Sequence, residues 1–227
     1  FGFIISFLGQ AQSYKISYLR SSNGKLIENQ DPIIVFSNND FTQITNEKLM
    51  AKKAEFPAEL IVINRAKNCI ETFGYLSESQ FIQTIDSVSL SKQTFEFLSD
   101  TKHILGYNCK KAKTIINSNT IELWYTEDLK IKGSPMTLGQ NLGLVLEINR
   151  NNNFLVSATK VEKIKNIPII EKSSKTLDLL TYRDLLWKSR FVTIPIFKEE
   201  IINFSDASKS NDSVFRYGNG TIALRKI

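Results

Sequence analysis

The feature that most constrains the fold is a succession of short apolar segments, rich in β-branched and aromatic residues, which turn signals separate as far as residue 165. Asn117-Ser118-Asn119 is one such signal, because asparagine tolerates the left-handed backbone of a tight turn. In the last segment Phe154, Val156 and Ala158 alternate with other residues, which favours a strand with one apolar face. Consecutive hairpins of this kind predict a mainly β fold: an antiparallel, strongly curved sheet or open barrel of about ten strands.

The predicted strands follow one another closely along the chain. They cover residues 14–19, 33–36, 41–44, 60–63, 69–75, 81–88, 94–98, 108–116, 120–126, 142–149 and 154–165.

The pattern changes after residue 165. Residues 166–176 contain Pro168 and a Ser-Ser pair, which favours a linker. A helix is expected over 177–189, with Thr176 as its cap, and it is followed by a short β segment. We therefore expect a β domain over 12–165 and, over 177–227, a helix with the beginning of a second, truncated β domain.

The first residues suggest export. Residues 1–8 form an uncharged apolar run, and Gly9-Gln10-Ala11 has the small-x-small pattern of a cleavage site. We interpret residues 1–11 as the remnant of a signal peptide cleaved near Ala11; the alternative is a buried N-terminal strand. The protein is then secreted or periplasmic and soluble, without a stable membrane span in the mature chain, because the run is too short to span a bilayer. The start at Phe1 and the strand-like end at Ile227 suggest a truncated gene product.

Charge and side-chain chemistry exclude several classes of function. The formal net charge is +6, but the positive residues are scattered, so nucleic acid is not an expected partner. His103 is the single histidine, and no close set of metal-binding residues is visible, so neither a catalytic constellation nor a metal or cofactor site is predicted. The carboxylates Glu122, Glu127, Asp128 and Glu147 are interpreted as surface charges. Whether the protein is an enzyme stays open.

Two residue pairs allow alternatives. Cys69 and Cys109 lie on different predicted strands and could form a disulfide, or stay as two buried thiols. Trp124 and Tyr125 are neighbours on one strand, so they point to opposite faces of the sheet. One belongs to the core, and the other is a candidate for lining a ligand-binding surface.

A central segment carries a family signature. Residues 103–113 resemble the Gly-Tyr-x-Cys-x-Lys-Ala element of the GLPGLI family of secreted Bacteroidetes proteins, and a Trp-Tyr-Thr element follows. The matching positions are Gly106, Tyr107, Cys109, Lys111, Ala112, Trp124, Tyr125, Thr126, Gly143 and Leu144. The naming motif itself is altered, because residues 140–145 contain no proline. The resemblance implies a non-catalytic accessory or binding module of the cell envelope, whose unknown ligand is an envelope protein, a peptide or an apolar molecule.

A second resemblance concerns the end of the chain. Residues 211–227 look like the opening strands of the jelly-roll domain of peptide-N-glycosidase F-like proteins. This resemblance implies the alternative function: the N-terminal part of an N-glycan amidase whose catalytic domain lies beyond Ile227.

Overall fold

The computed structural model describes residues 12–77, 80–168, 175–195, 215–217 and 221–225. The predicted signal-peptide remnant and most of the predicted linker therefore lie outside the described residues. By their contacts the residues divide into two compact units, which are described separately. Unit 1 comprises residues 1–54, 60–72 and 85–172, and unit 2 comprises residues 55–59, 73–84 and 173–227.

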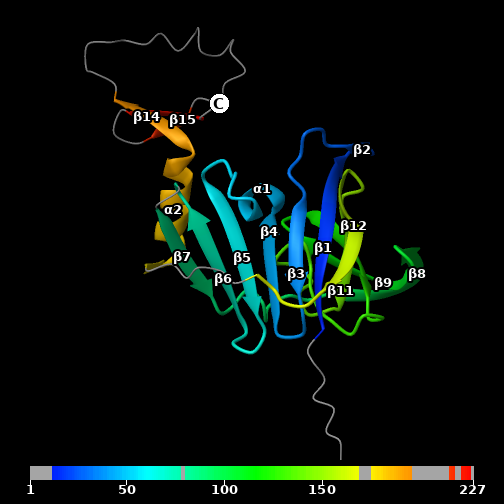
Figure 1. Cartoon of the computed structure of the whole chain (residues 1–227). Helices are drawn as coiled ribbons and strands as arrows, with labels where there is room; N and C mark the ends of the chain where they lie inside the picture. The colour runs from blue at the N-terminus through cyan, green and yellow to red at the C-terminus, as the bar shows by residue number, and fades with distance from the viewer. Residues whose placement is uncertain (1–11, 78–79, 169–174, 196–214, 218–220, 226–227) are drawn as a thin grey trace, which may run out of the picture. The chain divides into compact units, whose positions relative to one another are not determined.

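The described chain is mainly β, as predicted (Figure 1). Its strands are β1 (Ser13–Ser22), β2 (Lys25–Leu26), β3 (Ile33–Ser37), β4 (Phe41–Asn46), β5 (Ala58–Asn64), β6 (Cys69–Tyr75), β7 (Phe81–Asp86), β8 (Glu96–Ile104), β9 (Tyr107–Ile116), β10 (Asn119–Thr126), β11 (Leu144–Arg150), β12 (Phe154–Ile164), β13 (Thr176–Leu177), β14 (Phe191–Pro195), β15 (Phe215–Tyr217) and β16 (Thr221–Arg225). Two helices, α1 (Glu47–Met50) and α2 (Leu179–Ser189), accompany them.

The first thirteen strands form one sheet in the order β13-β7-β6-β5-β4-β3-β1-β12-β11-β10-β9-β8, with β2 beside β1. The sheet is open, because β13 and β8 end this order without pairing with each other. This confirms the predicted open sheet and excludes a closed barrel. Along this order, the strands from β5 to β8 run antiparallel to one another, and β13 runs parallel to β7. The strands β2 and β13, each two residues long, are too short to show alternation in a sequence.

Unit 1 is built around β1, which pairs with both β3 and β12. Its register shifts between Ser17 and Tyr18, and that of β10 shifts between Trp124 and Tyr125. Such bulges increase the local twist and bend a sheet. The Tyr18 side chain is fully buried, and its hydroxyl donates a hydrogen bond of 2.7 Å to the Val145 carbonyl. This bond joins two strands that are not neighbours in the sheet, because β12 lies between them.

The long loop between β10 and β11, residues 127–143, packs against other parts of unit 1. Arg65, in the turn after β5, donates from Nη2 to the Lys132 carbonyl at 2.8 Å and to Thr42 Oγ1 at 2.6 Å. Its Nε donates to the Gln140 carbonyl at 3.2 Å, and Gln140 is fully buried. Burial lowers the pKa of Arg65 to about 10, against the opposing effect of Asp40. One guanidinium therefore fastens this loop to two hairpins.

Unit 2 contains α2, which begins two residues later than the sequence suggested, at Leu179 instead of residue 177. Its N-cap is Asp178, whose side chain accepts from the Thr181 amide at 2.9 Å, and Thr176 is not the cap because it pairs with Gln83 in the sheet. The helix buries Tyr182 and Leu186, which pack with Ile82 of β7.

The packing of Tyr182 explains a glycine on β6. A Cβ at Gly74 would lie 2.8 Å from Tyr182 Oη, so only glycine leaves room for the ring. The same hydroxyl donates to Glu59 Oε1 at 2.8 Å. Separately, β14, β16 and β15 form a small antiparallel sheet in that order, which confirms the helix and short β segment predicted near the C-terminus. Neither described helix is long and apolar enough to cross a membrane.

Candidate functional site

The two predicted faces of β10 have different characters. Tyr125 is 6% exposed and belongs to the core of unit 1, where burial raises its pKa. Trp124 is half-buried on the opposite face, paired in register with Lys111 of β9 and Glu147 of β11. The adjacent residues therefore point apart, and Trp124 is the one on the polar face.

Trp124 is the centre of a charged network. Lys102 Nζ lies 4.7 Å from the centroid of the indole ring and Lys111 Nζ lies 5.4 Å from it. Each lysine also has a carboxylate partner, since Lys102 contacts Glu147 at 2.5 Å and Lys111 contacts Glu122 at 2.8 Å. The hydrogen bond that Lys111 donates to Glu122 raises the pKa of Lys111. The two cations and two anions balance, so this face carries no net charge at the tryptophan.

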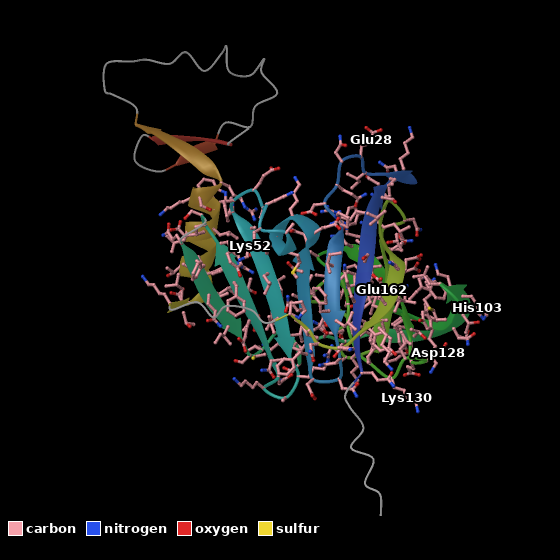
Figure 2. All side chains as sticks on the ribbon, viewed as in Figure 1. Glu28, Lys52, His103, Asp128, Lys130 and Glu162 are labelled. Atoms are coloured by element: carbon pink, nitrogen blue, oxygen red, sulfur yellow. The ribbon has the colours of Figure 1, made fainter. Side chains whose placement is uncertain are left out.

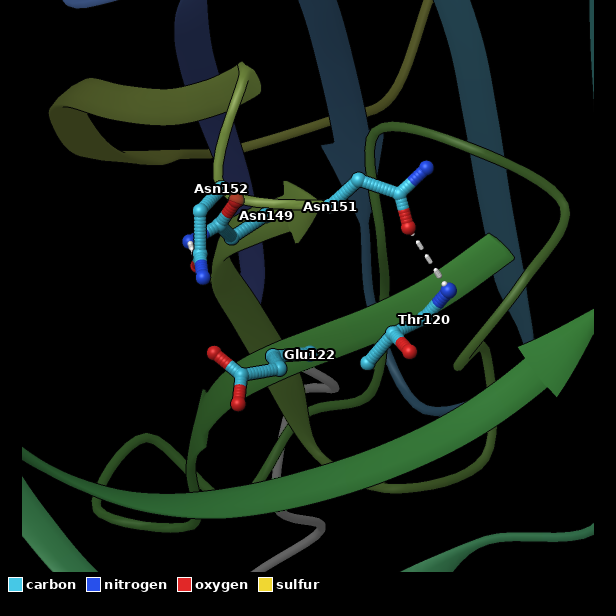
Figure 3. Close-up of a pocket in the computed structure, with 5 residues that line it drawn as sticks. All are labelled: Thr120, Glu122, Asn149, Asn151 and Asn152. Carbon is cyan, nitrogen blue, oxygen red and sulfur yellow. Dashed lines mark hydrogen bonds between the residues drawn. The ribbon is translucent and has the colours of Figure 1, made fainter. Parts of the chain in front are cut away.

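A polar pocket adjoins this network. It has a volume of about 320 Å³ and is lined by Thr120, Glu122, Asn149, Asn151 and Asn152 (Figure 3). Glu122 and Asn149 are partners across β10 and β11. The sequence indicated only Glu122 of these five, as a surface charge.

Two tight turns build the rim of the pocket. Asn117 and Ser118 have φ angles of 48° and 62°, and Asn151 and Asn152 have φ angles of 52° and 57°. Positive φ at both central residues is typical of the type I′ turn, which matches the twist of a two-residue hairpin. Asparagine at these positions therefore has a backbone reason. The pocket could therefore not be recognised from the sequence, because the need for a tight turn already explains the asparagines.

A side chain of one turn fastens it to the other. Asn151 Oδ1 accepts from the Thr120 amide at 2.8 Å, the bond drawn in Figure 3. Asn151 Nδ2 donates to Asn119 Oδ1 at 2.7 Å. On the other side, Asn149 Nδ2 donates to Asn152 Oδ1 at 3.0 Å. The pocket is thus shaped before any ligand arrives.

The remaining signature positions have mostly structural roles. Cys109, Ala112, Thr126 and Leu144 are buried. Gly143 lies against the end of β10, where a Cβ would be 2.6 Å from the Thr126 carbonyl oxygen. Gly106 forms the turn between β8 and β9 with a φ of 84°. Tyr107 is half-buried and packs against the core of unit 1.

The other polar residues that the sequence singled out lie in ordinary surface or structural contacts. The residues that the structure describes contain no group of three or more histidine, cysteine or acidic residues that could hold a metal ion. His103 is exposed near the end of β8 (Figure 2), and Asp128 accepts from the Asn108 amide at 2.9 Å. Glu127 pairs with Lys110 on the surface.

Both cysteines are free and buried, which is the second of the two alternatives left by the sequence. Burial raises the pKa of the Cys109 thiol to about 11 and also raises the pKa of Cys69.

At pH 8 a thiol of pKa 11 carries roughly 200-fold less thiolate than an ordinary cysteine of pKa 8.5. At pH 8 we therefore expect Cys109 of the folded protein to react with a thiol reagent roughly 200-fold more slowly than Cys109 of the urea-unfolded protein. The reaction rate of the folded protein should rise as the pH approaches 11. Titration of the unreduced, unfolded protein with the same reagent should count two free thiols. A disulfide between the two cysteines would contradict this prediction.

A family model and two solved structures relate this chain to the same kind of protein. The family model described as "N-glycanase peptide, N-terminal domain" matches residues 16–184. The chain is 51% identical to a solved structure of PNGF-II in space group P21, with a TM-score of 0.78. The alignment covers 96% of this chain and 41% of that one. A PNGF-II structure in space group C2 gives 51% identity and a TM-score of 0.76, with coverage of 95% and 40%. No curated protein matches. The chain thus spans about two fifths of the length of these solved structures.

Proposed function

This chain belongs to the family of PNGase F-II N-terminal domains, and from that membership we propose that it is the N-terminal part of an N-glycan amidase whose catalytic domain lies beyond Ile227. The observation that carries the proposal is the family match, which runs from β1 through most of α2. Identity of 51% over nearly the whole chain supports it further. The alternative suggested by residues 211–227 is therefore favoured over a free-standing module.

Within this protein, the region that the family model matches, residues 16–184, acts as a non-catalytic accessory domain. The half-buried Trp124 with its two lysine neighbours and the adjoining polar pocket support a role in binding. The resemblance to the GLPGLI family, with its envelope partner, and the secreted or periplasmic location with cleavage near Ala11 stay predictions. The family model that matches is not the GLPGLI model.

The proposal is tested by expressing the complete gene and residues 12–227 in parallel. Each protein is incubated with a glycoprotein that carries N-linked glycans, and released glycan is measured by chromatography. The complete protein is expected to release glycan and the 12–227 chain to release none. Inactivity of the complete protein under conditions where it is folded would overturn the proposal.

A further inference from the structure

We propose that the pocket lined by Thr120, Glu122, Asn149, Asn151 and Asn152 binds a neutral sugar unit. The volume of about 320 Å³ lies at the lower end of the range for small-molecule sites, which suits one or two small rings. The proposal rests on the proposed function in one respect: the sugar would belong to the glycan of the substrate.

Charge excludes ionic ligands from the pocket. Its single ionisable lining residue is Glu122, so the lining offers no cation that could bind a phosphate or a carboxylate. A cationic ligand would have to displace Lys111, whose Nζ already lies 2.8 Å from Glu122 Oε1. The site therefore favours a ligand without net charge.

The free hydrogen-bonding groups fit hydroxyls. Among the contacts within the described part of the chain, the Thr120 hydroxyl, Asn149 Oδ1 and Asn152 Nδ2 take part in no hydrogen bond. These atoms comprise an acceptor, a donor and a group that can do both. A sugar hydroxyl likewise donates and accepts, so it can satisfy all three. An apolar ligand would instead leave these polar atoms without water or a partner, at a cost in free energy.

Topology argues against a peptide in the same place. Peptides often bind a sheet by adding a strand to an open edge. The pocket lies over β10 and β11, and each of these strands is paired on both sides. No free backbone edge is available there, so recognition has to come from side chains. The bonds from the Thr120 amide to Asn151 and from Asn149 to Asn152 fix the three asparagine side chains in advance, which lowers the entropy lost on binding.

The test is a titration of the 227-residue chain with α-1,6-mannobiose and with N,N′-diacetylchitobiose, followed by the side-chain amide signals in NMR spectra. We expect at least one of them to bind with a Kd on the order of 1 mM, shifting the signals of Asn149 and Asn152. Asn149→Ala is expected to weaken this binding at least tenfold, and Thr120→Val to weaken it severalfold. The matched control is Asn108→Ala. Asn108 lies near the start of β9, whereas Thr120 of the pocket pairs with Ile115 near the end of that strand, so this variant should bind like the wild type.

Each outcome decides the proposal. Thermal unfolding of every variant is measured first, and Thr120→Val replaces Asn149→Ala if the latter is unfolded. The pocket proposal would be overturned if neither sugar bound, if the Asn108→Ala control lost as much binding as Asn149→Ala, or if glucuronate bound more tightly than both sugars. Glycan release by the complete protein without sugar binding here defeats the pocket proposal alone. Sugar binding here without release defeats only the proposed function.

Discussion

Replacing Arg65 by methionine is expected to lower the free energy of unfolding by about 2–4 kcal/mol. The guanidinium donates to the carbonyls of Lys132 and Gln140 and to Thr42 Oγ1, and methionine removes these three bonds. The Lys132 carbonyl keeps the Ser37 hydroxyl as a donor, so the unpaired acceptor is the Gln140 carbonyl. Hydrogen bonds from a charged donor are the stronger kind, and a buried acceptor without a partner costs further free energy. Urea unfolding followed by circular dichroism measures the change.

The variant Arg65→Lys is the control for charge. Lysine keeps the positive charge but has no planar fork, so it cannot reach the Lys132 and Gln140 carbonyls together. We expect it to recover at most half of the lost stability. Limited proteolysis gives a second measurement, since cleavage within residues 127–143 should accelerate in both variants. A loss below about 0.5 kcal/mol for Arg65→Met, the range of ordinary surface substitutions, would show that the loop is held by other contacts.

Gly143→Ala is expected to destabilise the chain by about 3 kcal/mol, the upper end of the range for overpacking. Its Cβ would lie 2.6 Å from the Thr126 carbonyl oxygen and 3.1 Å from Tyr125 Cδ2. A backbone oxygen in the sheet cannot move aside as a flexible side chain can. The midpoint of thermal unfolding is a sufficient measurement.

Gly106→Asn is the matched control for this prediction. Gly106 also belongs to the signature, but a Cβ there meets nothing within 4 Å. Its φ of 84° is in the left-handed region, which asparagine tolerates. We expect a change within about 0.5 kcal/mol. Equal losses at both glycines would refute the clash as the reason for glycine at 143.

The sequence predicts the strands well where alternation is unbroken, and less well where a bulge interrupts it. The strand predicted over 94–98 is β8, Glu96–Ile104, because the register shifts between Leu98 and Thr101 and the pattern stops there. The strand predicted to begin at residue 142 begins at Leu144, because Gly133 pairs with Gly143 and Leu144 and draws the preceding residues into the loop. Such long-range pairing leaves no local signal.

The pocket could not be predicted for a related reason. Thr120 and Asn151 are 31 positions apart, and only the register of β10 against β11 brings them into contact. The opposite directions of Trp124 and Tyr125 were predictable, since they follow from the alternation of one strand. The position of Lys102 beside Trp124 could not be predicted, because Lys102 meets its partner Glu147 across strands that are far apart in the chain.

The mass of the product peptide tests the central claim most directly. A glycopeptide with one N-linked glycan is incubated with the complete gene product, and the peptide is analysed by mass spectrometry. An amidase converts the glycosylated asparagine to aspartate, so the account predicts a sugar-free peptide that contains aspartate at that position, and none with residues 12–227 alone. A peptide that keeps its asparagine with one sugar attached, or a peptide left unchanged by the complete protein, would contradict it.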